Sequence, residues 1–200
     1  MKVAVVGGGS TYTPELVDGL ARLQHLVEVD ELVLTDPAEE RLLLVGGISQ
    51  RIFAKYGHAG QISITTDLEQ AVADATVVLI QLRVGGQAAR LLDETLPLTC
   101  GCVGQETTGA GGLAKALRTV PVVLEIAERV SDLAAKDAWI LDFTNPVGID
   151  LQELALDLGD FFGPRRFGAL LLHDMIMFIE VPEVVRRPHP QPAQYLSGKP

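Results

Sequence analysis

The sequence predicts an α/β fold in which helices cover both faces of a mostly parallel sheet. Three observations predict this doubly wound arrangement. Short apolar runs rich in β-branched residues alternate with segments of helical spacing, as in strand–helix–strand units. The first run, residues 2–6, leads directly into the glycine turn Gly7-Gly8-Gly9-Ser10. The second run, residues 32–35, ends at an acid, Asp36.

The other elements follow in chain order. Helical spacing begins after the glycine turn at Leu16, and it predicts the first helix there. The elements expected after it are a helix over 38–56, a strand over 61–66, a helix over 68–73, a strand over 75–80, a helix over about 112–135, and strands over 138–143 and 166–172. Prolines then accumulate and apolar spacing is lost. We therefore expect a folded domain at residues 1–172 and a proline-rich tail, disordered or poorly packed, at 173–200.

Composition narrows the possible functions. The chain has 200 residues, 48% of them hydrophobic and 21% charged, which predicts a globular protein of one large or two small domains. Its formal net charge of −10 argues against nucleic acid and against an anionic membrane surface as partners. No apolar run is long enough for a membrane span, and the first strand follows Met1 and Lys2 without a signal peptide. A cytoplasmic location is expected.

The two cysteines give a weak signal. Cys100 and Cys102 are separated by one residue, which is too close for an easy structural disulfide. Such a pair can bind a soft metal, but two thiols without nearby histidines are more often ordinary small residues of a loop.

The glycine turn predicts a site for a dinucleotide. A buried strand, a glycine turn and a helix start let the backbone approach a pyrophosphate, which the helix N-terminus then stabilises. Gly7 and Gly9 occupy the first two glycine positions of G-x-G-x-x-G, whereas Tyr12 stands at the third. We expect a Rossmann-like domain in which Gly7, Gly8, Gly9, Ser10 and Thr11 bind the cofactor.

Asp36 indicates which cofactor binds. It lies 27 residues beyond Gly9, where a carboxylate can accept hydrogen bonds from the adenosine ribose. Alternatively it caps the helix that starts near Pro37, and both roles can hold. A carboxylate there repels a 2′-phosphate, so NAD is expected rather than NADP.

Polar residues recur at the ends of later strands, where open α/β sheets bind ligands. Arg83 and Arg90 follow the fourth strand, Glu106 lies in a second glycine-rich loop, and Asn145 follows the fifth. Each alone has an ordinary reading, such as a surface charge, a solvated loop acid or a turn before Pro146. Their recurrence at successive strand ends favours one shared site.

Four motifs resemble the NAD-dependent family 4 glycoside hydrolases, and most closely the 6-phospho-β-glucosidase branch. They are GGGSTYTP at residues 7–14, QLRVGG at 81–86, GQETTGAGG at 104–112 and FTNP at 143–146. The resemblance runs from residue 1 to about 155, and this family lies outside the two-carboxylate glycosidases.

The resemblance implies a redox route to hydrolysis. NAD takes hydride from sugar C3, a tyrosine base removes the acidified C2 proton, and the glycosidic oxygen leaves by elimination before water adds and the hydride returns. A divalent cation, usually manganese, polarises the sugar oxygens. By motif, Arg90 and Asn145 contact the phosphorylated sugar, Arg83 helps to place sugar or cofactor, and Glu106 raises the basicity of the base. The glycines and Asp36 hold NAD.

The sequence also departs from this family. Members are more than twice as long, and their metal-binding cysteine has no counterpart in residues 167–172. Their metal-binding histidine and base tyrosine have no counterpart either, since His173 is a single histidine at a strand end and Tyr195 lies in the tail. Asp142 stands where the family often has asparagine. No metal ligand is therefore assigned.

Three functions remain open. The first is a 6-phosphoglycosidase, the second an inactive, truncated NAD-binding fragment, and the third a 2-hydroxy acid dehydrogenase. The third lacks a histidine near a strand end with a paired aspartate. A domain without its second half would expose an apolar face, so homo-oligomers are expected.

Overall fold

The computed structural model describes residues 1–144 and the strand at 166–169. In this part of the chain six strands form one sheet of order β3-β2-β1-β4-β5-β6, and every strand pair is parallel. The strands are β1 (Lys2–Val6), β2 (Glu31–Thr35), β3 (Gln61–Thr65), β4 (Val77–Ile80), β5 (Trp139–Asp142) and β6 (Arg166–Ala169). The helices are α1 (Thr13–Arg22), α2 (Glu39–Tyr56), α3 (Leu68–Val72), α4 (Gly86–Thr99) and α5 (Gly109–Leu133). The predicted doubly wound α/β fold is confirmed.

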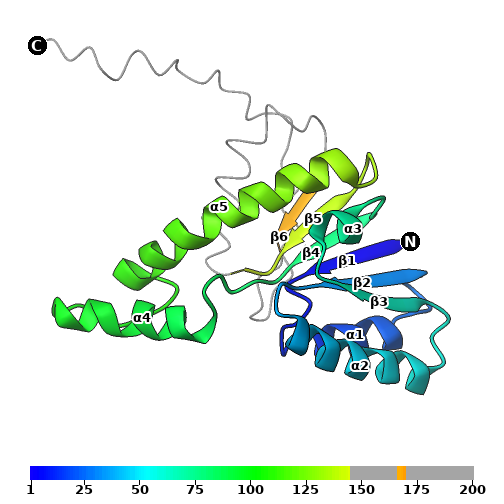
Figure 1. The fold of residues 1–200 in the computed structure, drawn as a ribbon, viewed down its shortest axis with the longest axis horizontal. Coiled ribbons are helices and arrows are strands. Elements are labelled where there is room, and N and C mark those ends of the chain that lie inside the picture. Colours follow the sequence, from blue (N-terminus) through cyan, green and yellow to red (C-terminus); the bar gives the residue numbers. More distant parts are fainter. Residues whose placement is uncertain (145–165, 170–200) are drawn as a thin grey trace, which may run out of the picture.

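Each face of the sheet has its own apolar core. Helices α1 and α2 cover one face, and α3 and α5 cover the other (Figure 1). The side chains of β1 alternate between them, because successive strand residues point to opposite faces. Val3 and Val5 pack towards α1 and α2, and Ala4 and Val6 pack towards α5. Burying each large apolar side chain contributes about 1.5–3 kcal/mol.

The register brings the carboxyl ends of the strands to one edge. Val6 pairs with Thr35 on one side and with Ile80 on the other, and Ile80 pairs with Asp142. Strand order reverses between β1 and β4, since the chain runs outward to β3 before it returns. Ligands of open α/β sheets bind outside the carboxyl ends at such a reversal.

Helix α4 is the element that the sequence pattern did not predict. Its buried residues are only Asp93 and Pro97, and its leucines are exposed, so its apolar side chains are not turned into the core of the sheet. The predicted elements within the described residues otherwise match within three residues at each end. Asn145, residues 170–172 of the expected last strand, His173 and the tail at 173–200 lie outside the described residues, so the boundary at 172 stays a prediction.

Candidate functional site

The glycine turn is held between the carboxyl ends of β2 and β4. The Gly7 and Gly8 amides both donate to the Thr35 carbonyl oxygen, at 2.9 and 2.8 Å. Gly7 has a φ of +86°, and a Cβ there would lie 2.3 Å from the Gln81 carbonyl oxygen. The left-handed backbone and the close approach both require glycine.

Asp36 is anchored to this turn. Its Oδ2 accepts from the Gly9 amide at 3.1 Å, and its Oδ1 accepts from the Ala38 amide at 2.9 Å. A Cβ at Gly9 would lie 2.9 Å from the Asp36 carboxyl carbon, so the second glycine makes room for this acid. Helix α2 has Ala38 as its N-cap and no side-chain cap, so Asp36 does not cap it directly. The carboxylate has lone pairs left for further donors.

The start of α1 adjoins the glycine turn, and the Tyr12 and Thr13 amides donate to Ser10 Oγ and to the Ser10 carbonyl oxygen. Its N-cap is Tyr12, without a side-chain cap bond, and the Tyr12 side chain is exposed. Behind it, the buried Thr13 hydroxyl accepts from Gln81 Nε2 at 2.6 Å, which ties the helix to the end of β4. A glycine turn beside a helix start suits a pyrophosphate. The NAD-binding roles of residues 7–11 and Asp36 remain predictions.

A charged cluster follows at the loops after β4. Glu106 Oε2 lies 2.5 Å from Arg83 Nη1, 3.5 Å from Arg90 Nε and 3.5 Å from Lys115 Nζ. We call these four residues the Glu106 cluster. Arg90 Nε also binds Glu94 Oε1 at 2.8 Å. The structure thus brings together Arg83, Arg90 and Glu106, as the sequence predicted, and adds Lys115, which it did not.

Charge and burial compete within the cluster. Burial by itself would raise the pKa of Glu106, but the hydrogen bond from Arg83 and the charges of Lys115, Arg83 and Arg90 outweigh it, so this pKa lies below its usual value. Burial lowers the pKa of Lys115, with Glu106 acting against it. Glu106 is therefore a carboxylate at neutral pH.

A second ion pair joins α5 to α4. Arg118 Nη1 and Nη2 donate to the two carboxylate oxygens of Asp93, at 3.1 and 2.6 Å, and Arg118 Nε donates to the Val84 carbonyl at 2.9 Å. A Cβ at Gly111 would lie 2.3 Å from the Asp93 carbonyl oxygen, so α5 and α4 pack backbone to backbone. Arg118 thereby joins α5, α4 and the loop that carries Arg83.

No motif marked Asp93, Lys115 or Arg118, and Gln81, which opens the QLRVGG motif, was not singled out as a site residue. The two helix α5 residues, Lys115 and Arg118, are three apart and share a face, but in the sequence they look like ordinary solvated charges. Lys115 is buried and Arg118 partly buried only because α4 packs against α5, and this packing between helices is not visible in the sequence.

The end of β5 carries a buried carboxyl. Asp142 is 1% exposed, its Oδ1 accepts from the Thr144 amide at 2.7 Å, and its Oδ2 has no partner among the described residues. The Thr144 hydroxyl accepts from the Leu82 amide at 3.2 Å, so this turn is tied to the end of β4. Burial raises the pKa of Asp142 to about 6 against the bonds to Thr144.

The described residues provide no metal site. Within them, no group of three or more histidine, cysteine, aspartate or glutamate side chains could hold an ion. Cys100 and Cys102 are both free and exposed in the turn after α4. The predicted substrate contact Asn145 cannot be placed, because it lies outside the described residues.

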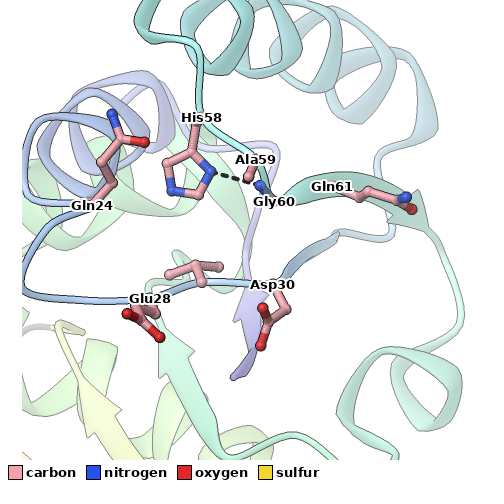
Figure 2. Close-up of a pocket in the computed structure, with 8 residues that line it drawn as sticks. Gln24, Glu28, Asp30, His58, Ala59, Gly60 and Gln61 are labelled. Carbon is pink, nitrogen blue, oxygen red and sulfur yellow. Dashed lines mark hydrogen bonds between the residues drawn. The ribbon is translucent and has the colours of Figure 1, made fainter.

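A hollow of about 320 Å³ lies at the opposite, amino edge of the sheet, lined by residues that include Glu28, Asp30 and His58 (Figure 2). His58 stacks on Phe53, and its Nδ1 accepts from the Gly60 amide. Burial lowers the pKa of His58. None of the predicted site residues lines this hollow.

Exposed apolar side chains gather on α4 and on the start of α5. They are Leu91, Leu92, Leu96, Leu98, Leu113 and Leu117. They fit the expected apolar face, although self-association itself stays a prediction. No helix among the described residues is long and apolar enough to cross a membrane.

Comparison with known proteins places the chain in a family. The model described as "Family 4 glycosyl hydrolase" matches residues 2–155. The probable 6-phospho-beta-glucosidase of Bacillus subtilis (strain 168) is 45% identical over 156 residues, which cover 77% of this chain and 35% of that protein. The chain thus spans about a third of the length of that relative.

Solved structures agree with the family match. A 6-phospho-alpha-glucosidase from gut microorganisms, in complex with NAD and glucose-6-phosphate, superposes with a TM-score of 0.80 at 32% identity, over 86% of this chain and 39% of that one. The 6-phospho-beta glucosidase of Thermotoga maritima, with the same two ligands, gives 0.74 at 40% identity, over 80% and 38%.

A lactate dehydrogenase from Cryptosporidium parvum gives a TM-score of 0.54 at 18% identity, over 79% of this chain and 41% of that one, which shows a shared fold alone. The family match, by contrast, covers most of the chain and includes the glycine turn and the Glu106 cluster. The chain belongs to family 4 of the glycosyl hydrolases.

Proposed function

We propose that this chain acts in the NAD-dependent hydrolysis of 6-phosphorylated glucosides and supplies the cofactor site of that reaction. The observation that carries the proposal is the common location of two features at the carboxyl edge of the sheet. The glycine turn with Asp36 follows β1 and β2, and the Glu106 cluster follows β4. Gly7 lies against Gln81, two residues before Arg83, so the two features are neighbours across the strand-order reversal.

In this proposal, different residues of the site bind the cofactor, bind the sugar and tune the base. The Gly7–Ser10 turn and the start of α1 hold the pyrophosphate, and Asp36 accepts from the adenosine ribose hydroxyls. Arg83 and Arg90 are half-exposed and bind the oxygens of a phosphorylated sugar. Glu106 supplies a fixed negative charge that raises the basicity of a neighbouring proton acceptor. When bound, NAD accepts a hydride from the sugar and returns it.

Other parts of the reaction need residues beyond this site. The solved relatives include a 6-phospho-alpha-glucosidase with NAD and Mn²⁺, but the described residues hold no group of metal ligands. We therefore assign no step of the reaction to a metal bound by the residues of this site. Relatives named for both anomers match, so the anomer acted on stays open.

The strongest alternative is an NAD-binding fragment without turnover. The chain spans 35% of the length of its Bacillus subtilis relative. A dehydrogenase acting on 2-hydroxy acids has only the shared fold in its support.

A hydrolysis assay separates the candidates. The purified chain is incubated with NAD, Mn²⁺ and p-nitrophenyl glucoside 6-phosphate of either anomer. The proposal predicts NAD-dependent release of nitrophenol, which Glu106→Gln abolishes and Glu28→Gln, on the opposite edge, leaves intact. NAD binding without release would establish the fragment. Net NADH formation from a 2-hydroxy acid would establish the dehydrogenase.

A further inference from the structure

Lys115 differs from the other cations of the Glu106 cluster in burial. Its side chain is 5% exposed, whereas those of Arg83 and Arg90 are 31% and 41% exposed. Lys115 lies on α5, and its Nζ approaches the same carboxylate oxygen that Arg83 binds. A buried ammonium is costly to keep unless an opposite charge lies close to it.

The two arginines have other partners available. Arg90 Nε lies nearer to Glu94, at 2.8 Å, than to Glu106, at 3.5 Å. Both guanidinium groups reach solvent, where a phosphorylated or hydroxylated ligand can draw them away from Glu106. The Lys115 side chain is enclosed, so its ammonium does not reach a ligand in solvent and stays beside Glu106.

We propose that Lys115 is a positioning residue that keeps Glu106 ionised and in place when Arg83 and Arg90 turn to a ligand. The role rests on the proposed function of the cluster. The arginines are the exchangeable counter-charges of Glu106, and Lys115 is the permanent one. Without Lys115, a ligand that took the arginines would leave a half-buried carboxylate uncompensated, and Glu106 would take up a proton.

The arginines can be removed by mutation to imitate the ligand. In the Arg83→Met, Arg90→Met double variant, the ¹³C carboxyl titration of Glu106 should still show an ionised carboxylate at pH 6. Adding Lys115→Met should raise the pKa of Glu106 by about one pH unit or more. Lys115→Arg in the same background should return the pKa of Glu106 to nearly its value in the double variant. The exposed Lys136→Met should leave this pKa unchanged.

The converse substitution provides a second test that does not depend on folding of the triple variant. In Glu106→Gln, the pKa of the Lys115 ammonium, followed by ¹⁵N resonance of Nζ, should fall, because coupling between two sites is reciprocal. Equal titration of Glu106 in the double and triple variants, or an unchanged Lys115 in Glu106→Gln, would overturn the proposal. These titrations need neither NAD nor turnover, so their failure is distinct from failure of the proposed function.

Discussion

The two neighbouring halves of the site are built in different ways. The glycine turn is held by backbone amides that donate to Thr35 and Asp36, over a core of apolar side chains. The Glu106 cluster is held by charged side chains from the loop after β4, from α4, from the loop after it and from α5. The first half tolerates almost no added atoms, whereas the second depends on pairing of charge. Substitutions should therefore act on the first half through steric overlap and on the second half through electrostatics.

Gly7→Val should have the largest effect on stability. The valine would need a φ of +86° and would place its Cβ 2.3 Å from the Gln81 carbonyl oxygen. Backbone strain and overpacking together should cost about 3 kcal/mol or more of the free energy of unfolding. Urea denaturation measures this change in the free energy of unfolding. Gly19→Ala in α1, where a Cβ meets nothing within 4 Å, is the control and should stabilise by about 0.5–1 kcal/mol.

Arg118→Met should test the electrostatic half. It leaves the buried Asp93 carboxylate without its bidentate partner, and breaking such a pair should cost about 3 kcal/mol. The matched control is Arg129→Met on the same helix, because the Arg129–Glu69 pair at 3.6 Å is exposed and should contribute about 0.5 kcal/mol or less. Equal losses in urea denaturation would show that burial does not decide the value of these pairs.

Asp142→Asn should stabilise the chain above pH 6. In the folded chain the pKa of Asp142 is raised from 3.8 to about 6, so the folded state binds more protons than the unfolded state between these values. Stability from this group is therefore full below pH 3.8 and is lost as pH rises through about 6. The difference between 3.8 and about 6 corresponds to a loss of about 3 kcal/mol in the free energy of unfolding. Thermal unfolding of both chains between pH 4 and 8 measures this, and parallel profiles would contradict the assignment.

Asp36→Asn should have the smallest effect on stability and a distinct effect on the cofactor. The amide can still accept from the Gly9 amide, but the negative charge that we propose binds the ribose hydroxyls is lost. NAD affinity should fall about tenfold, or about 1.4 kcal/mol. Asp30→Asn, before β2 instead of after it, serves as the control for NAD affinity and should leave it unchanged.

The same contrast explains what the sequence could predict. The strands, the glycine turn and Asp36 were found because strand, turn and acid are contiguous or evenly spaced in the chain. Arg83, Arg90 and Glu106 were expected to meet because parallel strands end at one edge. Lys115 and Arg118 were not found, since their roles arise only when α4 packs against α5. Helix α4 itself exposes its leucines, so no buried stripe marked it.

Calorimetric titration of the purified, folded chain with NAD shows whether the carboxyl edge between β1 and β4 binds this cofactor. We expect saturable binding that is weakened about tenfold by Asp36→Asn and is unchanged in Asp30→Asn. Absence of binding by a chain that unfolds cooperatively would contradict this expectation. So would binding that is insensitive to Asp36.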